Sequence, residues 1–268
     1  MLTDIVGGII IVPFIGLLAF KLRAVDLSGL ISGIFIGLSI FCLAGWRWFI
    51  VIFFFFASAS LATRVKYETK RRNGVAEEKG GARRWGNVLG NGLVAAMASA
   101  MYFITSGNPI YLLVFLGSVS TACADTIATE IGLTSNHPPR LIVNPFKIVG
   151  KGESGGVTLR GKVAGSVSSL LTGLLMVPST IHLGIPIQKI LTISVLSGFI
   201  GETLDSFMGA TIQGIYRCRV CGKITEKKLH CHVKTVQVKG IRWIDNNIVN
   251  FTATLIGGLS AALLYLAL

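Results

Sequence analysis

The chain has 268 residues, of which 52% are hydrophobic and only 14% are charged, and its mean hydropathy is +0.70. This composition excludes a soluble globular protein and is typical of a protein that crosses a membrane several times. The net charge of +13 suits anionic headgroups or phosphorylated substrates, and no nucleic-acid-binding motif accompanies it, so we expect no nucleic-acid partner.

Eight apolar segments are long enough to span, or nearly span, a bilayer core of about 30 Å. They predict an all-α, multi-pass integral membrane protein with a single transmembrane domain over residues 1–268. Because the chain starts without a basic segment, we interpret the first segment as a retained span rather than a cleaved signal peptide. The predicted spans are residues 4–20, 27–45, 46–62, 88–105, 109–133, 163–183, 185–213 and 248–268.

Basic residues predict the orientation of these spans, because Lys and Arg are retained on the cytoplasmic side during membrane insertion. All but two of the 25 Lys and Arg residues lie in the connections 21–26, 63–87, 134–162 and 214–247. We therefore expect these connections in the cytoplasm and both termini outside, in the cell membrane.

Two of the predicted spans carry similar acidic motifs. The fifth contains Asp125 and Glu130, and the seventh contains Glu202 and Asp205. Ionisable groups inside a membrane are costly and usually functional. The predicted topology makes the two spans parallel, so all four acids lie in the cytoplasmic halves of their helices and can face one site.

Four carboxylates in apolar segments, with no basic residue in either acidic motif, need a cation to neutralise them. Oxygen-only ligands favour Mg²⁺, which is commonly bound through one or two carboxylates together with substrate phosphates. We therefore expect these acids to bind Mg²⁺ in a phosphate-transfer site that faces the cytoplasm. The alternative is that some of them pair with Lys or Arg residues of the loops.

A glycine-rich basic connection follows the first acidic motif and offers backbone N–H groups and cations to an anion. It nearly matches a P-loop, but Val163 replaces the required Ser or Thr and no strand precedes it, so we reject a P-loop. We expect the connection to hold phosphates beside the acids. The alternative is a flexible connection whose charges only set the topology. The residues expected to take part are Lys151, Gly155, Gly156, Thr158, Arg160, Gly161 and Lys162.

Three of the five cysteines cluster in the connection 214–247. Cys218, Cys221, His230 and Cys231 have the spacing of a structural Zn²⁺ site, and the cytoplasm disfavours a structural disulfide. Because no open ligand position is apparent, we expect a zinc ion here to brace the loop rather than to catalyse. The alternative is free thiols.

Three asparagines lie near the cytoplasmic ends of predicted spans. Asn91 begins the fourth span, and Asn246 and Asn250 begin the eighth, one helical turn apart. Each taken singly fits an N-cap or interfacial residue. Together with the acids we consider them as substrate-binding residues.

The motif order resembles the membrane protein family that includes transmembrane protein 19 and plant phytyl-phosphate kinase. That family is similar in turn to polyprenol kinases and CDP-lipid synthases. The resemblance implies an enzyme that phosphorylates an isoprenyl monophosphate to the diphosphate, using Mg²⁺ and a nucleoside triphosphate, often CTP. The motifs are RWGNVLGNG (84–92), ADTIATEIG (124–132), GGVTLRG (155–161), the Cys218–Cys231 cluster with the histidine that follows it, and DNNIVN (245–250).

The favoured hypothesis is a membrane lipid-phosphate kinase. The four acids would bind one or two Mg²⁺ ions, and the glycine-rich connection would hold CTP or ATP. Arg160, Lys151 and Lys162 would neutralise the transferred phosphoryl group, and the prenyl tail would lie between spans, in contact with membrane lipid. The alternatives are a CTP-dependent nucleotidyltransferase that makes a CDP-lipid and a secondary transporter that uses the intramembrane acids. The sequence leaves the oligomeric state open, a homodimer included.

Overall fold

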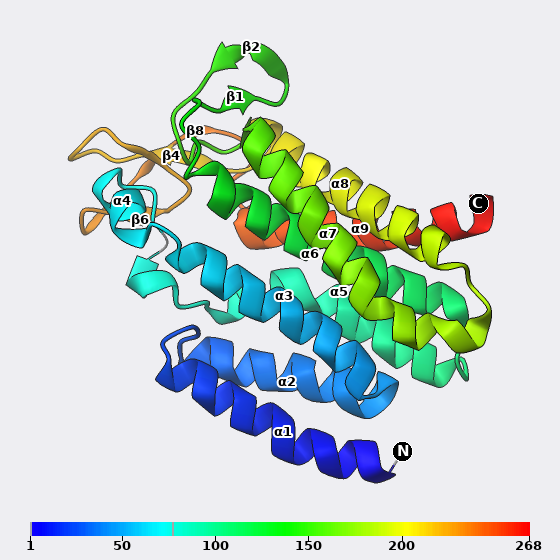
Figure 1. Cartoon of the computed structure of the whole chain (residues 1–268). Coiled ribbons are helices and arrows are strands. Elements are labelled where there is room, and N and C mark those ends of the chain that lie inside the picture. Colours follow the sequence, from blue (N-terminus) through cyan, green and yellow to red (C-terminus); the bar gives the residue numbers. More distant parts are fainter. Residues whose placement is uncertain (1, 77) are drawn as a thin grey trace.

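A computed structural model describes residues 2–76 and 78–268 as a bundle of long helices with short strands at one end (Figure 1). Seven of the described helices, α2, α3 and α5–α9, are long and apolar enough to cross a membrane, and α1 contains a shorter apolar stretch, Ile5–Lys21. The prediction of a mostly helical, polytopic membrane protein is confirmed. The helices are α1 (Leu2–Lys21), α2 (Leu27–Ala44), α3 (Trp46–Arg64), α4 (Tyr67–Arg72), α5 (Trp85–Ile104), α6 (Pro109–Gly132), α7 (Leu159–Thr180), α8 (Ile187–Thr211) and α9 (Asn246–Ala267), with 3₁₀ turns η1 (Glu78–Gly81) and η2 (Ile181–Leu183).

Helix α6 forms the centre of the bundle and packs against α3, α5, α7, α8 and α9. Its side chains Leu112, Phe115 and Leu116 are fully buried. Small residues let the neighbouring backbones approach closely, because Gly117 faces the backbone of Gly257 on α9 with no room for a Cβ atom. The predicted acidic motif of α6 therefore lies inside the protein rather than against lipid.

Helix α7 begins four residues before the predicted span. Thr158 is its N-cap, and the Thr158 side chain accepts a hydrogen bond from the Gly161 N–H at 3.1 Å. Arg160 and Lys162 therefore lie in the first turn of a helix and not in a loop.

Two of the predicted loops contain short antiparallel strands, which the all-α description misses. After α6, β1 (Arg140–Leu141) pairs with both β2 (Asn144–Ile148) and β3 (Gly156–Val157). Residues 212–245, between α8 and α9, form a second strand-bearing segment, which we call the cysteine lobe. In it β4 (Ile215–Arg217) pairs with β5 (Ile224–Thr225) and β8 (Val236–Lys239), and β6 (Leu229–His230) pairs with β7 (Val233–Lys234).

The four basic connections meet at the strand-bearing end of the bundle (Figure 1). Val25 forms a β-bridge with Arg83, Lys223 Nζ donates to the carbonyl oxygen of Gly74, and Ser154 Oγ donates to Glu226. The described start of α1 and the end of α9 lie at the opposite end of the bundle (Figure 1). That the strand-bearing end faces the cytoplasm stays a prediction from charge.

Candidate acidic site at the strand-bearing end

Asp125 of α6 and Asp205 of α8 lie close enough for their carboxyl groups to interact. Glu202 lies one turn before Asp205 on the same face of α8, is buried, and acts electrostatically on both aspartates. The two helices can approach because Gly201 of α8 packs directly on Thr121 of α6. The structure thus brings three of the four predicted acids together, and we call Asp125, Glu202 and Asp205 the acidic cluster.

Lys162 supplies a positive charge to the acidic cluster. Its Nζ atom lies 2.5 Å from Glu202 Oε2 and 2.9 Å from Thr203 Oγ1. Helix α7 brings Lys162 close because Gly161 packs against the backbone of Ala128, where a Cβ atom would lie 2.5 Å from the carbonyl oxygen. Lys162 is therefore both an ion-pair partner of Glu202 and a cation beside the predicted metal ligands.

Asn250 connects the acidic cluster to α5. The hydrogen-bond network assigns its amide orientation, in which Nδ2 donates to Asp205 Oδ2 and Oδ1 accepts from Asn91 Nδ2, both at 3.0 Å. Asn91 and Asn250 are buried and lie inside α5 and α9, so neither is an N-cap. The N-cap of α9 is Asp245, which accepts from the backbone N–H groups of its first turn, and Asn246 is the first residue of that helix.

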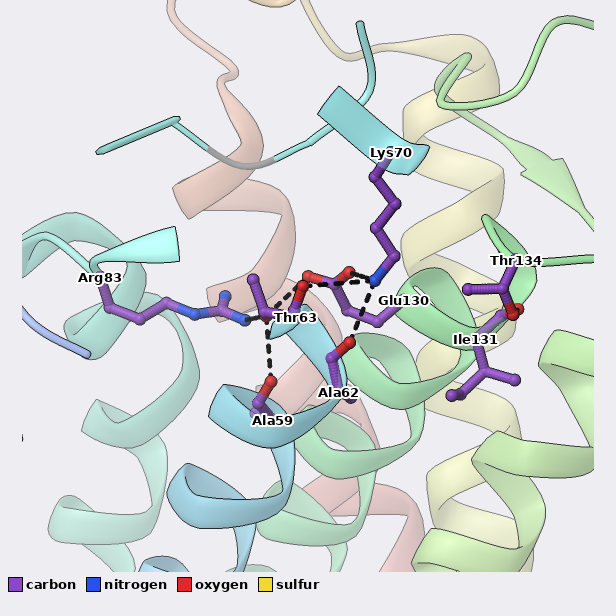
Figure 2. A network of polar contacts seen from close by, with 8 residues as sticks. All are labelled: Ala59, Ala62, Thr63, Lys70, Arg83, Glu130, Ile131 and Thr134. Atoms are coloured by element: carbon purple, nitrogen blue, oxygen red, sulfur yellow. Dashed lines mark hydrogen bonds and ion pairs between the residues drawn. The ribbon is translucent and has the colours of Figure 1, made fainter. Parts of the chain in front are cut away.

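Glu130 belongs to a different polar network from the acidic cluster (Figure 2). Its carboxylate accepts hydrogen bonds from Lys70 Nζ at 2.6 Å and Thr63 Oγ1 at 2.7 Å, and Arg83 donates to the same Thr63 oxygen at 3.2 Å. Glu130 follows Asp125 by five residues, which turns it about 140° around α6, towards α3 and α4. Our expectation of four converging acids is therefore corrected to three, and pairing with a loop lysine describes Glu130.

The other predicted cations lie at the same end and bond to backbone carbonyl groups. Lys151 Nζ donates to the Ser135 oxygen at 2.6 Å, and the exposed Arg160 donates to the Thr134 oxygen at 3.4 Å. These contacts attach the residues to the segment that follows α6. Both side chains reach the protein surface, where they can still meet an anion.

The predicted phosphate-binding glycines pack tightly against neighbouring backbone. Gly155 has a φ of +80° and lies directly on Ala210 at the end of α8. Gly156 is in β3 and packs against Val149, and Gly161 is the residue that packs on α6. Close packing accounts for these three glycines, so phosphate binding by them stays a prediction.

An apolar cavity of about 120 Å³ lies among α1, α2, α3 and α5. Aliphatic and phenylalanine side chains line most of it, and Arg83, Asn87 and Asn91 also line it. Because Asn91 bonds to Asn250, and Asn250 bonds to Asp205, two hydrogen bonds connect the cavity wall to the acidic cluster.

Comparison with known proteins assigns the family. The model of the family described as integral membrane protein DUF92 matches residues 10–258. The chain belongs to the DUF92 family. It is therefore an integral, multi-pass membrane protein, and the family resemblance predicted from its motifs is confirmed.

Several DUF92 relatives match over most of their length. Protein PGR of Arabidopsis thaliana is 30% identical and covers 94% of this chain and 93% of its own. An uncharacterized membrane protein of Methanocaldococcus jannaschii is 28% identical over 97% of this chain and 94% of its own. The chloroplastic protein VTE6 of A. thaliana is 25% identical over 88% of this chain and 64% of its own. No solved structure matches the chain significantly.

In this DUF92 protein, two charged residues at the site were not predicted from the sequence. The charge of Arg83 acts on Asp125, and that of Glu226, which follows β5, acts on both Asp125 and Asp205. Ser154 Oγ donates to Glu226 Oε1 at 2.5 Å. Both residues lie in long basic connections, and only the folding of those connections onto the bundle places them here.

The four predicted zinc ligands of the DUF92 chain converge in the cysteine lobe. One ligand atom from each of Cys218, Cys221, His230 and Cys231 lies within 4.8 Å of all the others. Hydrogen bonds from the backbone at Cys221 and Val220 lower the pKa of the Cys218 thiol to about 6. The hydrogen bond with the Cys221 side chain is the main cause that raises the pKa of Cys231 to about 11.

Proposed function

We propose that this DUF92 protein is a membrane kinase that transfers the γ-phosphoryl group of CTP or ATP to an isoprenyl monophosphate and forms the diphosphate. The observation that carries the proposal is that the Asp125, Asp205 and Glu202 carboxyl groups lie close enough to interact, with Lys162 paired to Glu202. The family resemblance and the similarity to VTE6 support the class of lipid acceptor.

Neighbouring carboxyl groups repel each other when both are ionised, unless a proton or a metal cation lies between them. Oxygen ligands favour a hard cation, so Asp125, Asp205 and Glu202 are the residues that would hold Mg²⁺. When bound, Mg²⁺ would neutralise triphosphate oxygens and help to orient the γ-phosphoryl group. We exclude Glu130 from this set because its carboxylate lies in the separate network of Thr63 and Lys70, away from the acidic cluster.

The remaining groups support the transfer itself. A lipid phosphate oxygen would attack the γ-phosphorus, and the bond to the β–γ bridging oxygen would break, releasing CDP or ADP. The acceptor phosphate is already ionised, so the step needs no strong general base. Lys162, with Lys151 and Arg160 from the same end of the bundle, would neutralise charge on the phosphoryl group, and catalysis would rest on positioning and electrostatics.

The apolar cavity is the place proposed for the lipid tail. Its aliphatic and phenylalanine lining suits a prenyl chain, and Arg83 lies both on its wall and close enough to Asp125 for their charges to interact. Arg83 would therefore bind the acceptor phosphate between the cavity and the acidic cluster. Asn91, through Asn250, would connect the acceptor side of the site to Asp205.

Purified protein in detergent, given CTP or ATP, Mg²⁺ and geranylgeranyl or phytyl monophosphate, tests the proposal. We expect the lipid diphosphate and the nucleoside diphosphate to form in equal amounts, and Asp125→Asn and Asp205→Asn to abolish both. Glu68→Gln, which changes an exposed acid on α4, is the matched control and should keep full activity. Release of pyrophosphate with a CDP-lipid would instead identify a nucleotidyltransferase, and the absence of any product with every nucleotide would refute the kinase.

A further inference from the structure

The cysteine lobe holds its four candidate ligands in two pairs. Cys218 and Cys221 lie in the turn between β4 and β5, and His230 and Cys231 lie at the tip of the β6–β7 hairpin. His230 Nδ1 is 3.5 Å from Cys221 Sγ and 3.3 Å from Cys231 Sγ. Sulfur atoms around a tetrahedral zinc ion are about 3.8 Å apart, since each Zn–S bond is about 2.3 Å. The observed spacing therefore needs only small side-chain movements to accept the ion.

The backbone of both turns is shaped to present the ligands. In the first turn, the Val220 N–H points at Cys218 Sγ with the nitrogen 3.4 Å away, and Gly222, at a φ of +72°, donates to the Cys218 carbonyl oxygen. In the hairpin, Cys231 and His232 both have positive φ, at 50° and 60°. Such two-residue turns normally use Asn and Gly, and a strained backbone persists where its surroundings enforce it.

The cysteine lobe has little apolar core to enforce this geometry. Among residues 217–240, all of which the structure describes, Cys218 alone is buried. The strands β5, β6 and β7 have two residues each. Small segments of this kind are usually held by disulfides or metal ions, and the three cysteines of the lobe, Cys218, Cys221 and Cys231, form no disulfide.

We propose that Cys218, Cys221, His230 and Cys231 bind one structural Zn²⁺ ion, and that this ion fixes Glu226 beside the acidic cluster. Residues 222–229 connect the two ligand pairs, so the ion would close them into a short loop with Glu226 inside it. Ser154 Oγ contacts the same Glu226 carboxylate, and Lys223 Nζ bonds to the Gly74 carbonyl oxygen, so the loop is also attached to two other connections.

The zinc content of full-length protein purified in detergent tests the first part. We expect about one zinc ion per chain in the wild type, and less than a fifth of that in Cys221→Ser and His230→Asn. His232→Asn, which changes a neighbouring histidine at positive φ, and Cys42→Ser, which changes a cysteine of α2, are the controls that should keep the ion. Wild-type protein without zinc, or equal zinc in Cys221→Ser, would overturn the proposal.

Amide hydrogen exchange tests the second part. Removing zinc with a chelator should speed exchange at least tenfold in peptides covering residues 219–235, and exchange in α6 and α7 should not change. Re-adding zinc should restore protection in the wild type but not in Cys221→Ser. Unchanged exchange after zinc loss would show that the ion does not hold the loop. Neither measurement uses a nucleotide or a lipid, so failure here is distinct from failure of the proposed kinase activity.

Discussion

The Nζ atom of Lys70 lies 2.6 Å from Glu130 Oε2, and the two side chains are only 2% and 7% exposed. Lys70 also donates to the carbonyl oxygen of Ala62 at 3.0 Å. The pair therefore holds α4 to the ends of α3 and α6 (Figure 2). Together with the hydrogen bond from Thr63, this contact holds the Glu130 carboxylate in a network separate from the acidic cluster.

Lys70→Ala should destabilise the protein by about 3–5 kcal/mol, because it leaves the buried Glu130 charge without a partner. Arg71→Ala, which removes an exposed ion pair with Glu68, is the matched control and should cost less than about 1 kcal/mol. Thermal unfolding in detergent measures both. Equal effects of the two substitutions would show that the buried pair contributes nothing special.

The double variant Lys70→Met, Glu130→Leu separates a structural role of Glu130 from metal binding. Replacing a buried ion pair by apolar residues of similar size is often close to neutral, so we expect the fold to survive. We also expect CTP or ATP with Mg²⁺ to raise its melting temperature as in the wild type. Asp125→Asn should abolish that rise in melting temperature. Loss of the rise in the double variant would show that Glu130 takes part in metal binding.

The sequence predicts the same substrate-binding role for Asn246 and Asn250, but the structure gives the two side chains different surroundings. Asn250→Ala should destabilise the protein by about 1–3 kcal/mol, because it removes a hydrogen bond to the Asp205 carboxylate and one from Asn91. Asn246, which is partly exposed in the first turn of α9, should tolerate alanine within about 0.5 kcal/mol. Unfolding measurements on the two variants decide the point, and similar losses would contradict the assigned amide network.

Hydropathy predicted the membrane helices well because burial in lipid depends on composition over a long window. Local capping shifted the start of α7, since Thr158 begins the helix and carries Lys162 into its first turn. The threonine that caps α7 is visible in the sequence, but the charge of Lys162 kept residues 159–162 out of the predicted apolar span. The short strands had no such signal: β2 and β8 are exposed along their whole length, so no alternation of apolar and polar residues marks them.

The sequence predicts which site residues come together when they share one helix face. It does not predict those that only tertiary contacts bring together. Glu202 and Asp205 share a face by spacing alone. Glu130 was grouped with them because its partner Lys70 lies 60 positions away and cannot be inferred from periodicity. The charge of Glu226 acts on Asp125 only because the cysteine lobe folds back onto the bundle. That placement depends on many loop contacts.

Gly33 offers a way to test the apolar cavity as the lipid-tail site. This residue lines the cavity, and a Cβ atom added to it would meet nothing within 4 Å. We therefore expect Gly33→Leu to occupy the cavity and to leave stability unchanged or slightly higher, because Leu favours a helix over Gly by about 0.5–1 kcal/mol. We expect KM for geranylgeranyl monophosphate to rise about tenfold or more while the KM for the nucleotide stays unchanged. Ile31→Leu, at an exposed position of the same helix, is the control, and an unaltered lipid KM in Gly33→Leu would place the tail elsewhere.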